Sequence, residues 1–256
     1  MNKRAMSPEM MVVLLAFVIV AMILLAFSDR LISVFREDSD IEICRLSVLA
    51  QSQTKSFGKS VVPLDCPGRN LKIYENKVEI NGKKSKKYEF KELTADELNH
   101  IVAEELRLCW YKMAEGNRNL FEQSYLFGDY NTCVRCSEIS FDEKLKGKSF
   151  EGIVDYLKSN KIPKADISYF DYLIRSQSNL YLLWGNIPWT QYTPWGYGTT
   201  KEFSEDRINT NEKYSIYFLA YKPAWLSQFT KAFTSAYYIG LGKEDKVSKE
   251  CAILVN

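Results

Sequence analysis

The chain has 256 residues and a formal net charge of +2, with 46% hydrophobic, 26% charged and 14% aromatic residues. This balance is typical of a folded globular protein and excludes an intrinsically disordered chain. The near-neutral charge also argues against nucleic acid as a partner.

The first predicted element is a membrane-spanning helix over residues 10–28. Residues 10–27, MMVVLLAFVIVAMILLAF, contain no charged residue, no Gly and no Pro. At about 1.5 Å of rise per residue this helix covers roughly 27 Å, close to the thickness of the hydrocarbon layer. A helix buried in a soluble core is the alternative, but such a helix would show a polar stripe. The sequence therefore predicts a single pass.

The charges that flank the apolar stretch predict its orientation. Lys3 and Arg4 precede it, whereas the residues that follow it are acidic on balance. Because the positive flank stays inside, we expect residues 1–9 in the cytoplasm and residues 29–256 outside the cell membrane. A cleaved secretory signal is the alternative. Such signals have a shorter apolar region followed by a small-x-small cleavage site, whereas the apolar region here is longer and no such site follows it.

The residues before the apolar stretch, KRAMSPE over 3–9, resemble the class III leader of archaeal pilins and archaellins. The resemblance implies cleavage between Ala5 and Met6, with the helix retained on the mature chain. Better-known bacterial pilins carry an acidic residue fifth in the mature chain, whereas Glu9 would be fourth here. An ordinary signal anchor is the alternative.

All cysteines lie on the predicted outer side. An even number of cysteines outside the cytoplasm favours structural disulfides, although six allow 15 pairings and the spacing alone does not choose among them. Each bridge would contribute roughly 2–4 kcal/mol to stability. The residues expected in bridges are Cys44, Cys66, Cys109, Cys133, Cys136 and Cys251.

The exterior region begins with a predicted helix over 39–53 and then a meander of short strands. The strands are predicted over 71–76, 77–82 and 86–90, with turns at Glu75-Asn76 and Asn81-Gly82. A basic run follows the second turn, for which a solvated turn is the expectation and a binding patch the alternative. Its members are Lys83, Lys84, Lys86 and Lys87.

The best-supported soluble helix starts at a capping box, Thr94 with Glu97, and ends at Gly116. Cys109 lies on its apolar face and can join Cys133 or Cys136, which we place in a loop over 131–139. Further on, the pattern predicts an amphipathic helix over Ser149 to Asn160. Strands are predicted over 179–184, 213–221, 235–241 and 250–255.

The cysteine-bearing half carries a second resemblance. The short motifs that carry it are Cys44-Arg45-Leu46-Ser47-Val48, Cys66, Cys109-Trp110, Glu115-Gly116, Asn119-Leu120-Phe121 and Cys133-Val134-Arg135-Cys136. Together they are similar to uncharacterised single-pass archaeal envelope proteins over roughly residues 1–141. This implies an archaeal source, an anchor and an exterior domain. The family carries no established activity to transfer.

Two cysteine chemistries compete with structural bridging. Cys133-x-x-Cys136 is the spacing of a thiol-disulfide oxidoreductase, but no clear helix follows it. The same pair with Cys109 and one further cysteine would hold zinc in a tetrahedral thiolate site, but a closed site usually shows two such pairs and the sequence has one. We therefore expect neither a metal nor any other cofactor.

The sequence gives little support for catalysis by its histidine or by its acidic pairs. The single histidine, His100, is expected to be a solvated residue on the polar side of its helix, since no nucleophile motif accompanies it. The acidic pairs Glu104/Glu105 and Glu202/Glu205 would suit acid–base hydrolysis of a glycan, but charged surface residues are the expectation.

The most unusual composition lies in a predicted long loop over 184–200, WGNIPWTQYTPWGYGTT. Its rings would stack on sugars, pack against another subunit or rest at lipid headgroups, unless they fold inward over the core. The candidate recognition residues are Trp184, Trp189, Tyr192, Trp195 and Tyr197.

Together these observations predict an α+β protein, in which a transmembrane helix precedes a disulfide-stabilised exterior domain over 29–256, with a possible subdivision near 146. The expected function is binding or assembly at an archaeal cell envelope, without catalysis. The expected partners are the membrane, a protein or glycan of the envelope and, in a homo-oligomer, further copies of the chain. A pilin-like filament subunit and an exterior oxidoreductase using Cys133 and Cys136 are the alternatives.

Overall fold

The computed structural model describes a set of segments distributed over most of the chain. They are residues 39–53, 55–56, 59–60, 64–116, 130–174, 180–184, 207–222, 236–250 and 253–255. The chain divides into two compact units, Met1–Glu42 and Ile43–Asn256, of which the second is described below. The predicted membrane helix lies outside the described residues, and none of the helices inside these ranges has the length and apolar composition of a membrane span.

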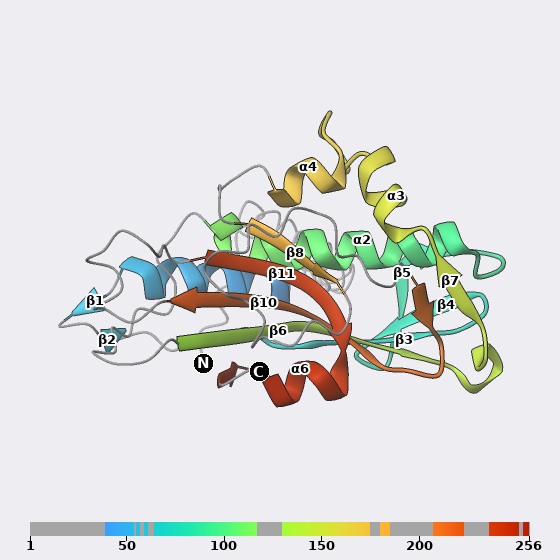
Figure 1. Cartoon of the computed structure of the whole chain (residues 1–256), viewed down its shortest axis with the longest axis horizontal. Coiled ribbons are helices and arrows are strands. Elements are labelled where there is room, and N and C mark those ends of the chain that lie inside the picture. The colour runs from blue at the N-terminus through green and yellow to red at the C-terminus, as the bar shows by residue number, and fades with distance from the viewer. Residues whose placement is uncertain are drawn as a thin grey trace, which may run out of the picture. The chain divides into compact units, whose positions relative to one another are not determined.

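A mixed β-sheet forms the centre of the Ile43–Asn256 unit (Figure 1). Among the described strands the order is β5-β4-β3-β6-β10-β11-β8, and β12 also pairs with β6. The β3–β6, β6–β12 and β11–β8 pairs are parallel and the others antiparallel. The strands are β3 (Arg69–Ile73), β4 (Lys77–Ile80), β5 (Lys83–Glu89), β6 (Tyr130–Phe141), β8 (Leu180–Trp184), β10 (Tyr214–Lys222), β11 (Ala236–Lys243) and β12 (Ile253–Val255).

Helix α2 (Ala95–Lys112) packs against β6, β10 and β11 on one face of this sheet. It begins as predicted, because the Thr94 side chain accepts a hydrogen bond from the Glu97 backbone N–H at 3.2 Å. The apolar stripe of α2 packs into the core between this helix and the sheet. The buried residues of this stripe are Leu98, Ile101, Val102, Leu106, Cys109 and Trp110.

Successive side chains of β10 point to opposite faces of the sheet, as strand geometry requires. Phe218 faces α2, where its ring centre lies 6.0 Å from that of Trp110. On the other face, Gly242 of β11 packs closely against Tyr217 and against Val247 of α6 (Glu244–Glu250). The sheet is therefore covered by α2 on one face and by α6 on the other.

Smaller elements complete the described part of the domain. Helices α3 and α4 lie against α2, and β7 pairs with β9 in a separate ribbon. A helix over 39–53 precedes the β1–β2 pair. The bounds are β1 (Lys55–Ser56), β2 (Lys59–Ser60), η1 (Ala114–Gly116), η2 (Glu143–Leu145), β7 (Ser149–Glu151), α3 (Ile153–Ser159), α4 (Tyr169–Ile174) and β9 (Arg207–Asn209).

Two disulfides confirm that cysteines bridge distant elements. Cys44 in the helix over 39–53 bonds to Cys66, and Cys109 in α2 bonds to Cys136 in β6. Cys133 is disulfide-bonded as well. Cys251 lies outside the described residues.

Most strands of the meander and of the second half form where the sequence predicts them. The turns at Glu75-Asn76 and Asn81-Gly82 separate β3, β4 and β5, and Asn81 and Gly82 both adopt positive φ angles of 51° and 76°. This is the backbone conformation that makes Asn-Gly a strong hairpin signal. The mixed α+β class is confirmed.

The predicted loop over 131–139 is wrong, because these residues belong to β6, the central strand of the sheet. Polar residues such as Asn131, Ser137 and Glu138 suggest a loop when they are considered locally. In the fold, β6 pairs with β3, β10 and β12, so the ladder hydrogen bonds of three neighbours fix it as a strand.

The predicted helix over Ser149 to Asn160 is correct only in its second half. Residues Ser149–Glu151 pair with β9 instead, with Phe150 opposite Ile208. Gly152 then takes a φ of 90°, which reverses the chain before α3 begins. The short helices α4 and α6 were not predicted, since neither is long enough to show a clear period.

Candidate ligand-binding groove

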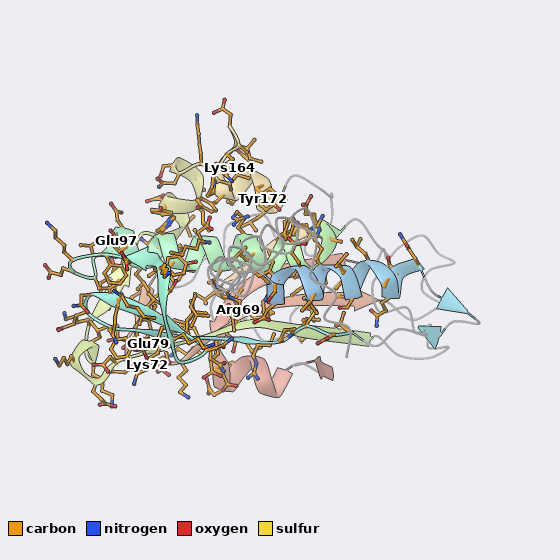
Figure 2. The ribbon with its side chains drawn as sticks, turned by 180° about the vertical axis from the view of Figure 1, so that it is seen from behind. Arg69, Lys72, Glu79, Glu97, Lys164 and Tyr172 are labelled. Atoms are coloured by element: carbon orange, nitrogen blue, oxygen red, sulfur yellow. A yellow bond between two sulfur atoms is a disulfide. The ribbon has the colours of Figure 1, made fainter. Side chains whose placement is uncertain are left out.

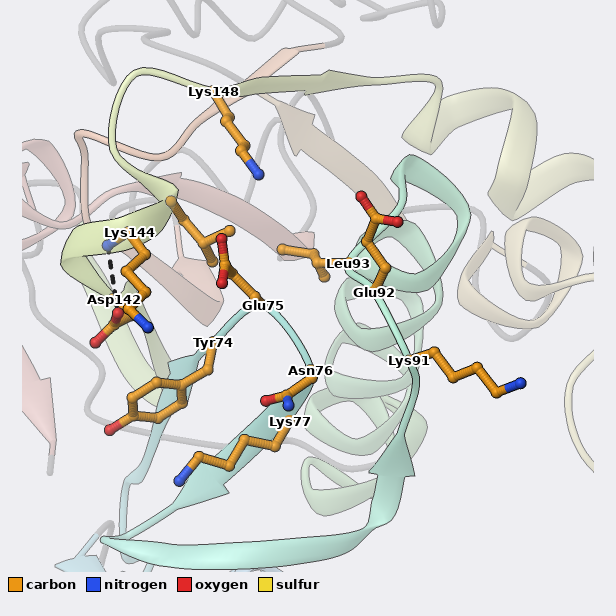
Figure 3. A pocket seen from close by; sticks show the side chains of 11 residues that line it. Tyr74, Glu75, Asn76, Lys77, Lys91, Glu92, Leu93, Asp142, Lys144 and Lys148 are labelled. Atoms are coloured by element: carbon orange, nitrogen blue, oxygen red, sulfur yellow. Dashed lines mark hydrogen bonds between the residues drawn. The ribbon is translucent and has the colours of Figure 1, made fainter.

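Three connections between strands and helices meet at one end of the sheet and form a groove of about 660 Å³ (Figure 3). They are the β3–β4 turn, the β5–α2 connection and the β6–β7 connection. A volume of roughly 300–1,000 Å³ is usual for clefts that hold a small ligand. The lining residues are Tyr74, Glu75, Asn76, Lys77, Lys91, Glu92, Leu93, Asp142, Lys144, Leu145 and Lys148.

Backbone hydrogen bonds join these three connections to one another. The Leu93 N–H donates to the carbonyl of Glu75 at 2.8 Å, which ties the β5–α2 connection to the β3–β4 turn. The Asp142 N–H donates to the carbonyl of Ile73 at 2.9 Å, which ties in the β6–β7 connection. The groove is therefore held by the main chain, independently of its charged side chains.

The wall that carries Lys148 is fixed by Thr210, a buried residue after β9. The Thr210 N–H and hydroxyl both donate to the Lys148 carbonyl at 3.0 Å, and the Lys148 N–H donates to the Thr210 hydroxyl at 3.1 Å. The neighbouring Gly147 N–H donates to the side chain of Asn211 at 2.9 Å. Lys148 therefore has a firmly placed backbone and an exposed side chain.

The groove combines a small apolar floor with charges of both signs. Leu93 and Leu145 are buried beneath it. Within the described part of the chain, no carboxylate lies within 4.0 Å of the ammonium groups of Lys91, Lys144 or Lys148. Glu75 and Glu92 likewise form no ion pair with a described residue.

Three of these unpaired charges point into the groove. Figure 3 shows the side chains of Lys148, Glu75 and Glu92 turned toward its middle, whereas Lys91 points away from it. Exposed side chains that keep their charge without a partner are available to a ligand. The groove thus offers one cation and two anions over an apolar floor.

Tyr74, which is the aromatic residue in the described part of the lining, makes contacts with its neighbours on β3 and β4. The ammonium groups of Lys77 and Lys72 lie over its ring, 4.5 Å and 5.2 Å from the ring centre. Its hydroxyl donates to Glu79 at 2.9 Å. Glu79 also accepts from Lys77 at 2.5 Å, and this hydrogen bond raises the pKa of Lys77 and lowers that of Glu79.

A second polar cluster lies beneath α2, around the acidic pair Glu104 and Glu105. The expectation that these are surface residues is wrong, because each is only 1% exposed. Glu202 and Glu205, the other predicted acidic pair, lie outside the described residues. A buried charge is costly unless it is paired and hydrogen-bonded, so the partners decide what this pair does.

Side chains from three other residues donate hydrogen bonds to the carboxylate of Glu104. Arg107 donates from Nε and Nη2, both at 3.0 Å, and Lys87 donates at 2.6 Å. Tyr169 of α4 donates its hydroxyl at 2.5 Å. Burial alone would raise the pKa of Glu104, but these hydrogen bonds and the charge of Lys87 prevail and lower the pKa to about 2.

Glu105 has its own set of partners. Arg69 projects from β3 (Figure 2) and donates to Glu105 at 3.1 Å, with both side chains buried. The hydroxyl of Tyr88 donates to Glu105 at 3.3 Å. Burial of Tyr88, together with the negative charges of Glu105 and Glu104, raises the pKa of Tyr88 well above its usual value.

A bulge in the edge strand β5 brings two of these donors to α2. Glu79 pairs with Lys84 and Lys77 pairs with Glu89, so several residues of β5 stand opposite a single residue of β4. Such a bulge redirects the side chains of the longer strand. Lys87 and Tyr88 lie within it, and they reach Glu104 and Glu105.

The acidic pair is therefore committed to internal contacts. Both carboxylates are inaccessible and hydrogen-bonded, so neither can reach a substrate. Among the described residues, no group of His, Cys, Asp or Glu is arranged to hold a metal ion. The arrangement joins α2, β3, β5 and α4, which is a structural role.

His100 is not the solvated residue that the sequence predicts. It is half-buried, and its Nδ1 lies 3.0 Å from the hydroxyl of Tyr156 in α3. The ring of Tyr88 contacts it edge-on, with centres 6.2 Å apart. This contact helps α3 to pack on α2.

The Cys133-x-x-Cys136 motif does not form an internal bridge. Cys136 is bonded to Cys109, and both Cys133 and Cys136 are buried. A redox pair needs an accessible thiolate that exchanges with its neighbour. This geometry does not favour the oxidoreductase alternative.

The other predicted site residues are not described. Ala5 and Met6 lie outside the described residues, as do Trp189, Tyr192, Trp195 and Tyr197. Trp184 ends strand β8, whose side chains are not described either.

The sequence did not identify the groove. Its three walls come from residues 74–77, 91–93 and 142–148, which become neighbours only when β3 and β6 pair in parallel. The one local signal was the predicted turn at Glu75-Asn76. No protein-family model, curated protein or solved structure matches this chain.

Proposed function

We propose that this chain is a membrane-anchored exterior binding module, which holds a polar ligand of the cell envelope in the groove at the end of its sheet and does not catalyse a reaction. The anchor is the apolar stretch over 10–28, with Lys3 and Arg4 on its inner side. Disulfides such as Cys44–Cys66 and Cys109–Cys136 support an oxidising location outside the cytoplasm.

The observation that carries this proposal is the set of unpaired charges in the groove. Lys148, Glu75 and Glu92 face its middle on a main chain that is already fixed by hydrogen bonds. Binding to such a site costs little backbone ordering, because the walls are formed before the ligand arrives. The buried acids Glu104 and Glu105 are already satisfied, which supports binding over hydrolysis.

The experiment is amide hydrogen exchange on the full chain in detergent, with and without solubilised material from the cells' own envelope. We expect slower exchange in residues 74–77, 91–93 and 142–148 when the ligand is present. The charge-reversed variant Lys148→Glu should lose this protection, and Lys164→Glu, at a residue that does not line the groove, should keep it. Protection elsewhere alone, or none, would overturn the proposal.

A pilin-like assembly subunit is a second candidate, favoured by the KRAMSPE residues over 3–9. It requires a mature chain that begins at Met6. Intact mass spectrometry of the protein from its native host decides this point, since a chain that still begins at Met1 would rule out leader cleavage.

A further inference from the structure

We infer that the groove takes an extended segment of a partner protein that carries both acidic and basic side chains, rather than a glycan. This inference rests on the proposed function and specifies its ligand. It follows from the arrangement of charged side chains in the groove and from the contacts that Tyr74, the aromatic residue of its described lining, already makes.

Charge complementarity favours a ligand of both signs. A purely anionic ligand would meet Lys148 but would also face Glu75 and Glu92, whereas a purely cationic one would face Lys148. Like charges in one site cost free energy, and opposite charges select the partner. A polypeptide with alternating acidic and basic side chains satisfies all three groups at once.

The contacts that Tyr74 already makes argue against a sugar as the ligand. Protein sites hold sugars largely by stacking them on exposed aromatic faces, and Tyr74 is the only aromatic ring among the described residues that line this groove. Lys77 and Lys72 lie over that ring, and its hydroxyl is bonded to Glu79. A sugar that stacked on this ring would have to compete with these two ammonium groups.

The nature of the floor sets the expected strength of binding. Leu93 is 6% exposed and Leu145 is fully buried, so little apolar surface is left for a ligand to cover. Most of the attraction must come from exposed charges, which interact weakly in water and are screened by salt. Binding is therefore weak and sensitive to ionic strength.

The test measures binding of synthetic probes to the full chain in detergent by fluorescence anisotropy. The probes are a peptide of alternating Glu and Lys, an all-Glu peptide, an all-Lys peptide, a neutral chitin oligomer and a sulfated oligosaccharide. We expect the alternating peptide to bind best, and to weaken roughly tenfold between about 50 mM and 500 mM salt.

Two charge reversals within the groove sharpen the test. Glu92→Lys should shift the preference toward the all-Glu peptide, and Lys148→Glu should shift it toward the all-Lys peptide. Both side chains are exposed and make no described side-chain contact, so both variants should fold. Matched reversals outside the groove, Asp155→Lys and Lys164→Glu, should leave the order of the probes unchanged.

The outcomes separate this inference from the proposed function. Groove-dependent binding of either oligosaccharide in preference to the peptides overturns the inference and leaves the proposed function standing. A charge-reversed variant that binds every probe as the parent does also overturns it. Absence of protection by envelope material in the exchange experiment overturns both.

Discussion

Tyr169 in α4 donates its hydroxyl to the carboxylate of Glu104 in α2 across 2.5 Å. Two further tyrosines make similar contacts: the hydroxyl of Tyr156 in α3 lies 3.0 Å from Nδ1 of His100 in α2, and that of Tyr172 in α4 donates to Glu115 in η1 at 3.2 Å. Tyrosine hydroxyls therefore hold the α3–α4 segment against α2 and η1. Without the Tyr169 hydroxyl, the buried carboxylate of Glu104 would have one hydrogen-bond donor fewer.

We predict that Tyr169→Phe lowers the free energy of unfolding by about 1.5–3 kcal/mol, because it removes a hydrogen bond to a buried charged group. Tyr172→Phe is the matched control, since its partner Glu115 is 30% exposed and water can replace the lost donor. Urea denaturation of the full chain in detergent measures both. A larger loss for Tyr172→Phe would contradict the assignment of Tyr169 as the principal fastening.

Stability should fall in acid through Glu104. Its pKa is about 2 in the folded protein against an ordinary value of 4.5, so the folded state binds the proton more weakly than the unfolded chain does. The stabilisation is therefore complete above about pH 5 and is lost as the pH falls through the folded pKa of about 2. The shift corresponds to something on the order of 3 kcal/mol.

Glu104→Gln tests this prediction by urea denaturation between pH 2 and pH 7. The variant should be less stable than the parent at neutral pH, and the difference should shrink steadily as the solution is acidified. Glu143→Gln, which alters an exposed ion pair with Lys146, should leave the acid dependence unchanged. A stability difference that is the same at every pH would show that Glu104 does not titrate as described.

The Cys109–Cys136 bridge should be important for stability, because it connects α2 to the central strand β6. The double variant Cys109→Ser/Cys136→Ser should lose about 3 kcal/mol, since the bridge closes a loop with a sequence separation of 27 residues. Peptide mapping without reduction should recover Cys109 with Cys136, and Cys44 with Cys66. A native protein in which Cys136 reacts with an alkylating probe would reopen the redox alternative.

The sequence predicted those elements whose signals are local. Thr94 with Glu97 marks the start of α2 within four residues of chain, and Asn81-Gly82 marks the β4–β5 turn by its own backbone preference. The apolar stripe of α2 likewise repeats within the helix. Such features need no knowledge of what lies across the fold.

Long-range pairing determines the features that the sequence did not predict. Strand β6 looks polar along the chain and becomes a central strand only because β3, β10 and β12 pair with it. Glu104 and Glu105 resemble surface acids until the β5 bulge and α4 supply their donors. The groove arises in the same way, from three distant connections.

Gly116 should tolerate no side chain, for two separable reasons. Its φ is 65°, and an added Cβ would lie 2.7 Å from Cη2 of the buried Trp110. A positive φ costs an alanine about 1 kcal/mol or more, and overpacking adds about 1–3 kcal/mol, so Gly116→Ala should lose about 2–4 kcal/mol of stability.

Gly147 also has a positive φ, 83°, but nothing lies within 4 Å of its added Cβ. Gly147→Ala should therefore show the backbone cost alone, about 1 kcal/mol. Gly68, with open space and no positive φ, should accept alanine with a change below about 0.5 kcal/mol. Urea denaturation of the three variants checks this order. Equal losses at Gly116 and Gly147 would mean that Trp110 gives way to the added methyl group, and that the contact between η1 and this indole of α2 is looser than the distances indicate.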